Sequence, residues 1–304
     1  MPRLPPAEKL PLAVRKNVRD EWENNRESYE KRFSDLLGVE WKINITPAAI
    51  YPYAEEGSYG HSSLGACIKS YIEGAEYQLK YYIEKAGDLL KDDINSIAHA
   101  HVITMDFDED KLFSYCGVKV TPEGELAILF AEGYLGTNVD HAMEKSNLAK
   151  ALDNAPNDKP LNHTARVGIK EDYDPKIAAA QAELNKYLGK EVPFDPNFDE
   201  TWAKLKASSE TRDDYPTNLG SFTLKYLEGL NWYLKCQKFD TDDMLQEGLT
   251  EALENNAVKF RIVDKLSRSY NEPVVEDGVL YLQTTAANWG TNVDNIADGL
   301  IELL

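Results

Sequence analysis

Histidines are distributed unevenly along the 304-residue sequence. His61, His99, His101 and His141 lie in the first half, and His163 follows near the middle. His99 and His101 are two residues apart, a spacing that places both side chains on one side of a β-strand. Imidazole nitrogens bind metals and transfer protons near neutral pH. The sequence therefore gives His99, His101 and His141 as candidate catalytic residues.

A nearby carboxylate would complete a metal site. Asp106 lies in the same predicted strand, and His99, His101 and Asp106 are the candidate ligands, with a divalent metal as the candidate cofactor. The competing interpretation is structural. His101 falls on the same strand face as Ile103 and Met105, where a hydrogen-bonded core histidine is the commoner finding.

Three further patterns suggest chemistry without completing it. Asp106, Asp108 and Asp110 resemble the start of a calcium loop, but Lys111 replaces the required glycine. Cys67 and Cys116 are candidate nucleophiles with no base fixed beside them; we expect Cys67 to be buried and Cys116 to be more exposed. The sequence has no GxSxG, GxxxxGK[ST], GxGxxG or HExxH motif.

The residues that must position these side chains form two similar series. The peptide GTNVD occurs at 136–140 and again at 290–294. Matching Leu, Gly and Tyr positions upstream recur at separations of 151 to 155 residues, and the separation changes only between elements. Such drift is typical of insertions confined to loops. We therefore predict a tandem duplication, with a pseudo-two-fold arrangement of the copies.

Periodicity predicts one α+β unit, written twice. Each copy is expected to be roughly α-α-α-β-β-β-α, with an antiparallel sheet because its connections are short. In the first copy the strand at 102–107 alternates in polarity, and the strand at 126–131 is apolar on both faces, as a central strand would be. The predicted organisation is a proline-rich tail at 1–12, a first repeat at 13–152, a linker at 153–163 and a second repeat at 164–304.

Two expectations follow from comparing the copies. Thr137 and Asp140 are three residues apart, which predicts that GTNVD caps the last helix of the unit, from residue 138 to about 152 and from 292 to 304. His99, His101 and His141 correspond to Glu254, Asn256 and Asn295, so any histidine site belongs to the first copy alone. The aromatic pairs at 81–82 and 232–233 are expected to pack in the core.

Composition excludes some classes of function. The net charge of −19, from 33 basic and 52 acidic residues, repels nucleic acid and anionic lipid. The three cysteines are an odd number without a CxxC pair, which indicates free thiols and a reducing, cytoplasmic location. No apolar run is long enough for a membrane span, and no secretory signal is apparent.

Three hypotheses of function remain open. The first is a non-catalytic intracellular binding protein for a small ligand or a protein partner, using a cleft between the two repeats. The second is an enzyme, such as a metal-assisted hydrolase, with a single site in the first repeat that uses His99, His101 and His141. The third is a structural or assembly protein. The matched positions are mostly Gly, Leu and Tyr, which folding alone requires, and this favours the first hypothesis.

Overall fold

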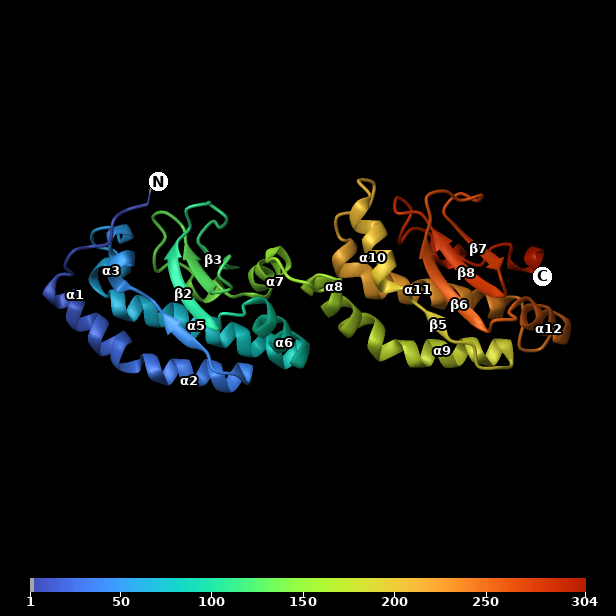
Figure 1. The fold of residues 1–304 in the computed structure, drawn as a ribbon, viewed down its shortest axis with the longest axis horizontal. Helices are drawn as coiled ribbons and strands as arrows, with labels where there is room; N and C mark the ends of the chain where they lie inside the picture. Colours follow the sequence, from blue (N-terminus) through green and yellow to red (C-terminus); the bar gives the residue numbers. More distant parts are fainter. Residues whose placement is uncertain (1–2) are drawn as a thin grey trace. The chain divides into compact units, whose positions relative to one another are not determined.

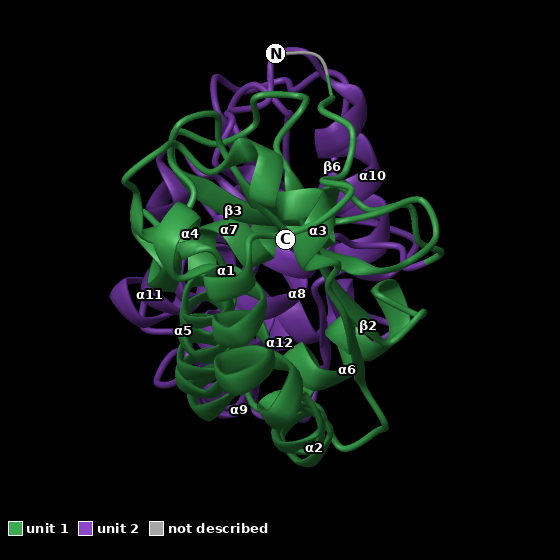
Figure 2. Ribbon diagram, turned by 90° about the vertical axis from the view of Figure 1, so that its left-hand side faces the viewer, with its two compact units in different colours: residues 1–158 green, residues 159–304 purple. Residues whose placement is uncertain are grey.

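The computed structural model describes residues 3–304, so the first two residues of the predicted tail lie outside the described part. The chain forms two compact units, unit 1 (residues 1–158) and unit 2 (residues 159–304), and the boundary falls inside the predicted linker (Figure 2). Each unit is α+β and contains one four-stranded mixed sheet. Among residues 3–304, no helix is both long and apolar enough to cross a bilayer.

Unit 1 contains several short helical segments and one long helix, which lies between its first and second strands in the sequence (Figure 1). Its helices are α1 (Leu12–Asn17), the π-helical η1 (Val18–Trp22), the 3₁₀ turn η2 (Glu23–Asn25), α2 (Arg26–Leu37), α3 (Pro47–Ile50), η3 (Tyr51–Tyr53), α4 (Tyr59–Ser62), α5 (Leu64–Ala86), α6 (Asp88–Ile97), η4 (Val139–His141) and α7 (Lys145–Asn154). Its strands are β1 (Lys42–Asn44), β2 (Val102–Phe107), β3 (Cys116–Val120) and β4 (Leu126–Phe130).

Unit 2 has a closely similar order of elements. Its helices are α8 (His163–Gly168), the π-helical η5 (Ile169–Tyr173), α9 (Asp174–Leu188), α10 (Phe198–Ala207), α11 (Tyr215–Cys236), α12 (Asp243–Ala252) and the 3₁₀ turns η6 (Val293–Asn295) and η7 (Leu300–Leu303). Its strands are β5 (Phe194–Asp195), β6 (Ala257–Ile262), β7 (Asn271–Glu276) and β8 (Val279–Thr284).

The sheets are mixed, so the prediction of an antiparallel sheet is wrong. The strand order is β1-β2-β4-β3 in unit 1 and β5-β6-β8-β7 in unit 2. β2 pairs with β1 and β4 in parallel, and only β3 runs antiparallel, against β4. The short connection after β2 leads to β3 at the edge of the sheet, and β4 then lies between β2 and β3. β2 and β3 follow each other in the sequence but are therefore not neighbours in the sheet. β4 is buried along its whole length, which confirms it as a central strand.

The first helix of each unit is interrupted by a π-helical turn. The turns η1 and η5 are 151 residues apart in the sequence, the same separation as Gly38 and Gly189, which end α2 and α9 in the left-handed conformation. The helical stretch of unit 2 begins at His163 and is capped by the Asn162 side chain. Pro175 is tolerated because it lies in the first turn of α9.

The long helices α5 and α11 pack very closely against these π-helical turns. A Cβ atom at Gly65 would lie 2.5 Å from the Asn17 carbonyl oxygen, and one at Gly220 would lie 2.6 Å from the Gly168 carbonyl oxygen. Only glycine allows backbones to approach at such distances. The Asn17 side chain also accepts hydrogen bonds from the Gly65 and Ala66 amides, so it satisfies the first turn of α5.

The predicted last helix forms only in part. Asn138 and Asn292 adopt left-handed conformations, so each GTNVD segment turns through a 3₁₀ turn instead of starting a helix, and Thr137 caps nothing. In unit 1 a helix, α7, starts later, at Lys145. In unit 2 only 3₁₀ turns follow, because Gly299 is also left-handed and breaks the segment.

The GTNVD segments are tied to the long helices by matching contacts. The Gly136 amide donates to the Tyr71 hydroxyl (3.1 Å), and the Gly290 amide donates to the Tyr226 hydroxyl (2.8 Å). Gly74 of α5 lets the turn approach, since a Cβ there would lie 2.7 Å from the Cα of Asp140. GTNVD is thus a packing motif of the fold.

Removing either tyrosine hydroxyl is expected to destabilise its unit. Tyr71→Phe or Tyr226→Phe leaves a glycine amide without its acceptor, at a cost of about 1–2 kcal/mol. Urea unfolding of each variant measures the change. Tyr77→Phe is the matched control, because Tyr77 is an exposed tyrosine of the same helix α5, and its midpoint should stay at the wild-type value. Equal midpoints for Tyr71→Phe and Tyr77→Phe would contradict this role of the hydroxyl.

Candidate functional site

The predicted histidine site is divided between the two ends of the sheet of unit 1. His99 and His101 precede β2, whereas His141 follows β4 in the turn η4. β2 and β4 are parallel, so the start of β2 and the end of β4 lie at opposite ends of the strands. The structure therefore places His99 and His101 at the amino ends of the parallel strands and His141 beyond their carboxyl ends.

Asp106 does not join the histidines either. It lies five residues beyond His101, about 16 Å along an extended strand, whereas metal–ligand bonds are about 2 Å. Its carboxylate pairs with Arg3 of the N-terminal segment. Across residues 3–304, no group of three or more His, Cys, Asp or Glu side chains could hold a metal ion. The predicted set of His99, His101 and Asp106 is thus not assembled.

His101 and His141 instead have local partners. His101 has a left-handed backbone, and its Nε2 lies 3.0 Å from the Asn95 carbonyl oxygen, with its ring packed on Trp41. His141 lies 3.4 Å from a Glu144 carboxylate oxygen and is exposed. These contacts match the interpretation of His101 as a hydrogen-bonded structural histidine.

The thiols of unit 1 are buried. Cys67 and Cys116 are both at most 5% exposed, so the expectation of an exposed Cys116 is wrong. Burial raises the pKa of each thiol to about 12, helped at Cys116 by the charges of Asp140 and Glu144. A protonated thiol is a poor nucleophile, so neither residue is prepared for catalysis. The Cys116 thiol instead donates to the Asn138 carbonyl and holds the GTNVD turn.

Three exposed tyrosines lie on the loops at the carboxyl ends of the parallel strands of the unit 1 sheet. We call Tyr59, Tyr115 and Tyr134 the tyrosine surface; they are 45%, 44% and 42% exposed. Tyr115 and Tyr134 pack edge to face, with ring centroids 5.0 Å apart. The three side chains come from α4, from the residue before β3, and from the loop after β4.

Close loop packing brings these three segments together. Leu135 is buried against Gly60, the neighbour of Tyr59; a Cβ at Gly60 would lie 2.8 Å from its side chain. A Cβ at Gly136 would lie 3.2 Å from the Tyr59 ring. The surface therefore rests on a rigid base, although its rings are half open to solvent.

The loops that carry the tyrosine surface are strongly acidic. Residues 51–60, 108–115 and 131–140 contain seven acidic residues and one basic residue, Lys111. The corresponding loops of unit 2, residues 206–215, 263–270 and 285–294, contain five acidic and four basic residues. Tyr270 of unit 2 is 45% exposed at the position that matches Tyr115. The acidic aromatic surface is thus a feature of unit 1, and unit 2 offers a natural control.

Sequence reasoning missed this surface. The available signal was the repeated occurrence of tyrosine beside carboxylates in loops, as in EEGSY and EGY.

The prediction that the aromatic pairs on the long helices pack in the core is correct only in part. Tyr82 and Tyr233 are buried as expected, but Tyr81 and Trp232 are exposed, because adjacent residues on a helix point about 100° apart and only the second residue of each pair faces the core.

Comparison of the chain with protein-family models, with curated proteins and with solved structures finds no match.

Proposed function

We propose that this chain is a non-catalytic binding protein whose partner is a basic protein that docks on the tyrosine surface of unit 1. The observation that carries the proposal is a set of half-exposed tyrosines on packed loops that also carry six exposed carboxylates and the buried Asp108. Tyrosine is strongly enriched among the residues that dominate binding energy at protein interfaces. Its rigid ring contributes apolar contact at low entropic cost, and its hydroxyl can bond to a partner.

The charge of the surface favours a cationic partner. Seven carboxylates in the three loops and a net charge of −19 attract a basic protein over a distance of about a Debye length, which raises the association rate. Arginine and lysine side chains can also pack on tyrosine faces through cation–π contacts, which contribute about 0.5–2 kcal/mol. The same charge disfavours nucleic acids as partners.

We infer further that the chain arose by tandem duplication and that only unit 1 carries this surface. The inference is supported by the shared strand order, by the π-helical turns and by the matching Tyr–Gly hydrogen bonds. The ligand cleft between the repeats and their pseudo-two-fold arrangement stay predictions.

We also propose a cytoplasmic location, which is supported by three free cysteines, two of them buried.

Comparative affinity purification tests the proposed function. The immobilised wild-type chain, the double variant Tyr115→Ala/Tyr134→Ala and the control Tyr270→Ala are incubated with an extract of the cells that express the protein. We expect a protein of net positive charge to bind the wild type and the control and to be lost with the double variant. With that protein purified, the double variant should weaken binding by about 30-fold or more, equivalent to about 2 kcal/mol.

Two results would contradict the proposal. The first is that every captured protein binds the double variant and the wild type equally. The second is that the protein distinguished by the double variant is acidic. Circular dichroism and urea unfolding should show that all three proteins are folded, since both tyrosines are exposed and surface substitutions usually change stability little.

A further inference from the structure

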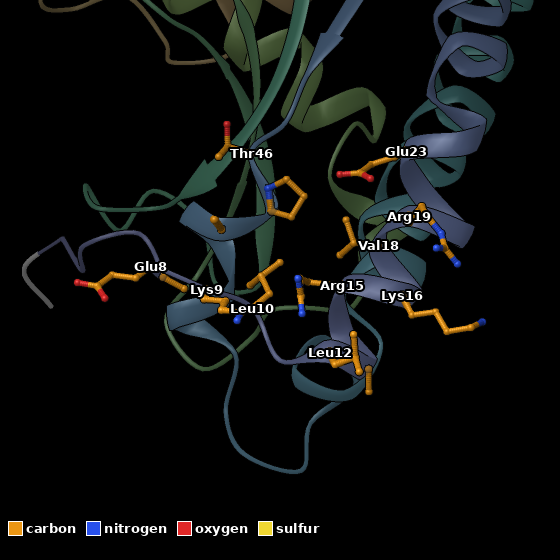
Figure 3. Close-up of a pocket in the computed structure, with 14 residues that line it drawn as sticks. Glu8, Lys9, Leu10, Leu12, Arg15, Lys16, Val18, Arg19, Glu23 and Thr46 are labelled. Carbon is orange, nitrogen blue, oxygen red and sulfur yellow. The ribbon is translucent and has the colours of Figure 1, made fainter.

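A second surface of unit 1 is formed by the N-terminal segment and the first helix. Residues 7–10, the helical stretch 12–23 and residues 46–48 line a groove of about 1200 Å³ (Figure 3). Its apolar lining includes Leu10, Leu12, Val18 and Pro47. Leu12 is 74% exposed, so the groove offers apolar contact that nothing in the described chain covers.

The groove is a built part of the fold. The Ala7 amide donates to the Ala48 carbonyl (2.8 Å), and the Leu4 amide donates to the Tyr53 hydroxyl (2.9 Å). Val18 is buried at its floor and belongs to the core of the unit. The N-terminal segment is therefore held on the unit, and the predicted tail forms one wall of the groove.

The groove is lined by four basic and two acidic residues, and Glu8, one of the two acidic residues, extends away from it (Figure 3). Lys16 and Arg19 extend away from it and both pair with Asp20 (Figure 3). Arg15 extends from the helix toward the opposite wall, and Lys9 lies on that wall. Within residues 3–304, neither Lys9 nor Arg15 forms an ion pair, so their charges are available to a bound anionic group.

The dimensions of the groove indicate what it can hold. The helical stretch 12–23 is roughly 18 Å long, and an α-helix of that length and about 10 Å across occupies roughly 1400 Å³. The groove volume of about 1200 Å³ is close to that value and exceeds the usual range for small molecules, about 300–1000 Å³. An apolar floor with a charged rim is the arrangement that receives an amphipathic helix.

We propose that this groove is a docking site for an acidic amphipathic helix of a protein partner. Leucine-like side chains of the helix contact Leu10, Leu12 and Val18, and its carboxylates contact Lys9 and Arg15. Glu23 lies at the other end of the groove, where it favours the positive N-terminal end of the bound helix. The bound helix then runs antiparallel to α1.

A designed peptide tests the proposal on the full chain. The probe is a fluorescent, stapled helical peptide of about twelve residues, with leucines on one face and glutamates elsewhere; the staple is needed because short helices are unstable alone. Binding is followed by fluorescence anisotropy at about 0.15 M salt, where the long-range repulsion by the net charge is screened beyond about 8 Å. We expect saturable binding, weakened by about tenfold or more in Leu12→Asp/Arg15→Glu.

Matched controls separate this site from the tyrosine surface. Lys176→Glu makes the same charge change as Arg15→Glu at an exposed lysine of unit 2, and Tyr115→Ala/Tyr134→Ala removes the tyrosine surface. Both should bind the peptide as the wild type does. A peptide with lysine in place of glutamate should not bind the groove; any binding of that peptide to the tyrosine surface should be lost in Tyr115→Ala/Tyr134→Ala and kept in Leu12→Asp/Arg15→Glu.

Several outcomes would overturn the proposal. Equal weakening of the acidic and basic peptides by Leu12→Asp/Arg15→Glu would show that the contact in the groove is not charge-selective. Unchanged affinity in Leu12→Asp/Arg15→Glu would place the peptide elsewhere. Binding of oleate without binding of the peptide would make the groove a small-amphiphile site, and self-association that depends on Arg15, without peptide binding, would make it an interface between copies of this chain.

Discussion

Gly65→Ala is expected to lower the free energy of unfolding of unit 1 by about 3 kcal/mol or more. The added methyl group would lie 2.5 Å from the Asn17 carbonyl oxygen and 2.6 Å from the Val18 Cα, so the helix α5 and the turn η1 must move apart. Overpacking against backbone cannot be relieved by a side-chain rotation. The separation would also lengthen the hydrogen bonds from the Gly65 and Ala66 amides to Asn17.

The same substitution at the matching position provides an internal test. Gly220→Ala should destabilise unit 2 in the same way, because its methyl group would lie 2.6 Å from the Gly168 carbonyl oxygen. Hydrogen exchange followed by mass spectrometry distinguishes the units, since peptides from residues 3–158 and 159–304 are measured separately. We expect Gly65→Ala to accelerate exchange mainly in unit 1 and Gly220→Ala mainly in unit 2.

Gly248→Ala is the control for the loss of glycine itself. Gly248 lies inside α12, and a Cβ there would meet only the Leu304 Cβ at 3.7 Å, an ordinary contact. Alanine in a helix interior should stabilise unit 2 by about 0.5–1 kcal/mol. A wild-type unfolding midpoint for Gly65→Ala would refute the close contact between α5 and η1.

Glu272→Ala is expected to destabilise unit 2 by about 3 kcal/mol at neutral pH. Glu272 is only 4% exposed at the start of β7, and its carboxylate accepts the Ser267 amide (3.0 Å), the Arg268 amide (3.1 Å) and the Gln283 side chain (2.7 Å). Removing it leaves these donors without an acceptor, and a buried unpaired donor costs about 1–3 kcal/mol. The loop 263–270 should lose its order first.

The contribution of Glu272 to the unfolding free energy of unit 2 should depend on pH. Burial alone would raise the pKa of its carboxyl group, but the hydrogen bonds from Ser267, Gln283 and Arg268 outweigh burial and lower that pKa below its ordinary value of 4.5. Because the pKa is lower in the folded state, the stabilisation is complete above about pH 4.5 and is lost as the pH falls through the folded-state pKa.

Urea unfolding at several pH values measures this effect. The difference in unfolding free energy between the wild type and Glu272→Ala should be largest at pH 7 and should shrink below about pH 4.5. Glu251→Ala, at an exposed glutamate of α12, should remain close to the wild type at every pH. A constant difference across the pH range would show that packing, and not the charge of Glu272, stabilises the loop.

Several elements were predicted correctly from local pattern. The strand at 102–107 forms with Ile103, Met105 and Phe107 buried, and the left-handed Gly38 ends α2. Both signals depend only on neighbouring residues, namely the two-residue period of a strand and the ability of glycine to adopt positive φ. The long helices α5 and α11 likewise follow from local pattern, because their apolar stripes repeat over many turns.

The candidate site was predicted poorly because its geometry is non-local. His99, His101 and His141 all lie in unit 1, but the parallel pairing of β2 and β4 places His99 and His101 at one end of these strands and His141 at the other. The tyrosine surface has the opposite character: Tyr59, Tyr115 and Tyr134 are far apart in sequence and meet only because the loops pack around Leu135 and Gly136.

The sequence by itself determined the long helices, the alternating strand at 102–107, the acidic charge and the α+β class, since these follow from composition and from periodicity within one element. The tertiary structure decided the mixed strand order, the burial of Cys116 and the role of GTNVD as a packing motif. Strand order depends on which edge each strand joins, and burial depends on which segments cover a residue. Both are set by contacts between distant parts of the chain, which no local pattern records.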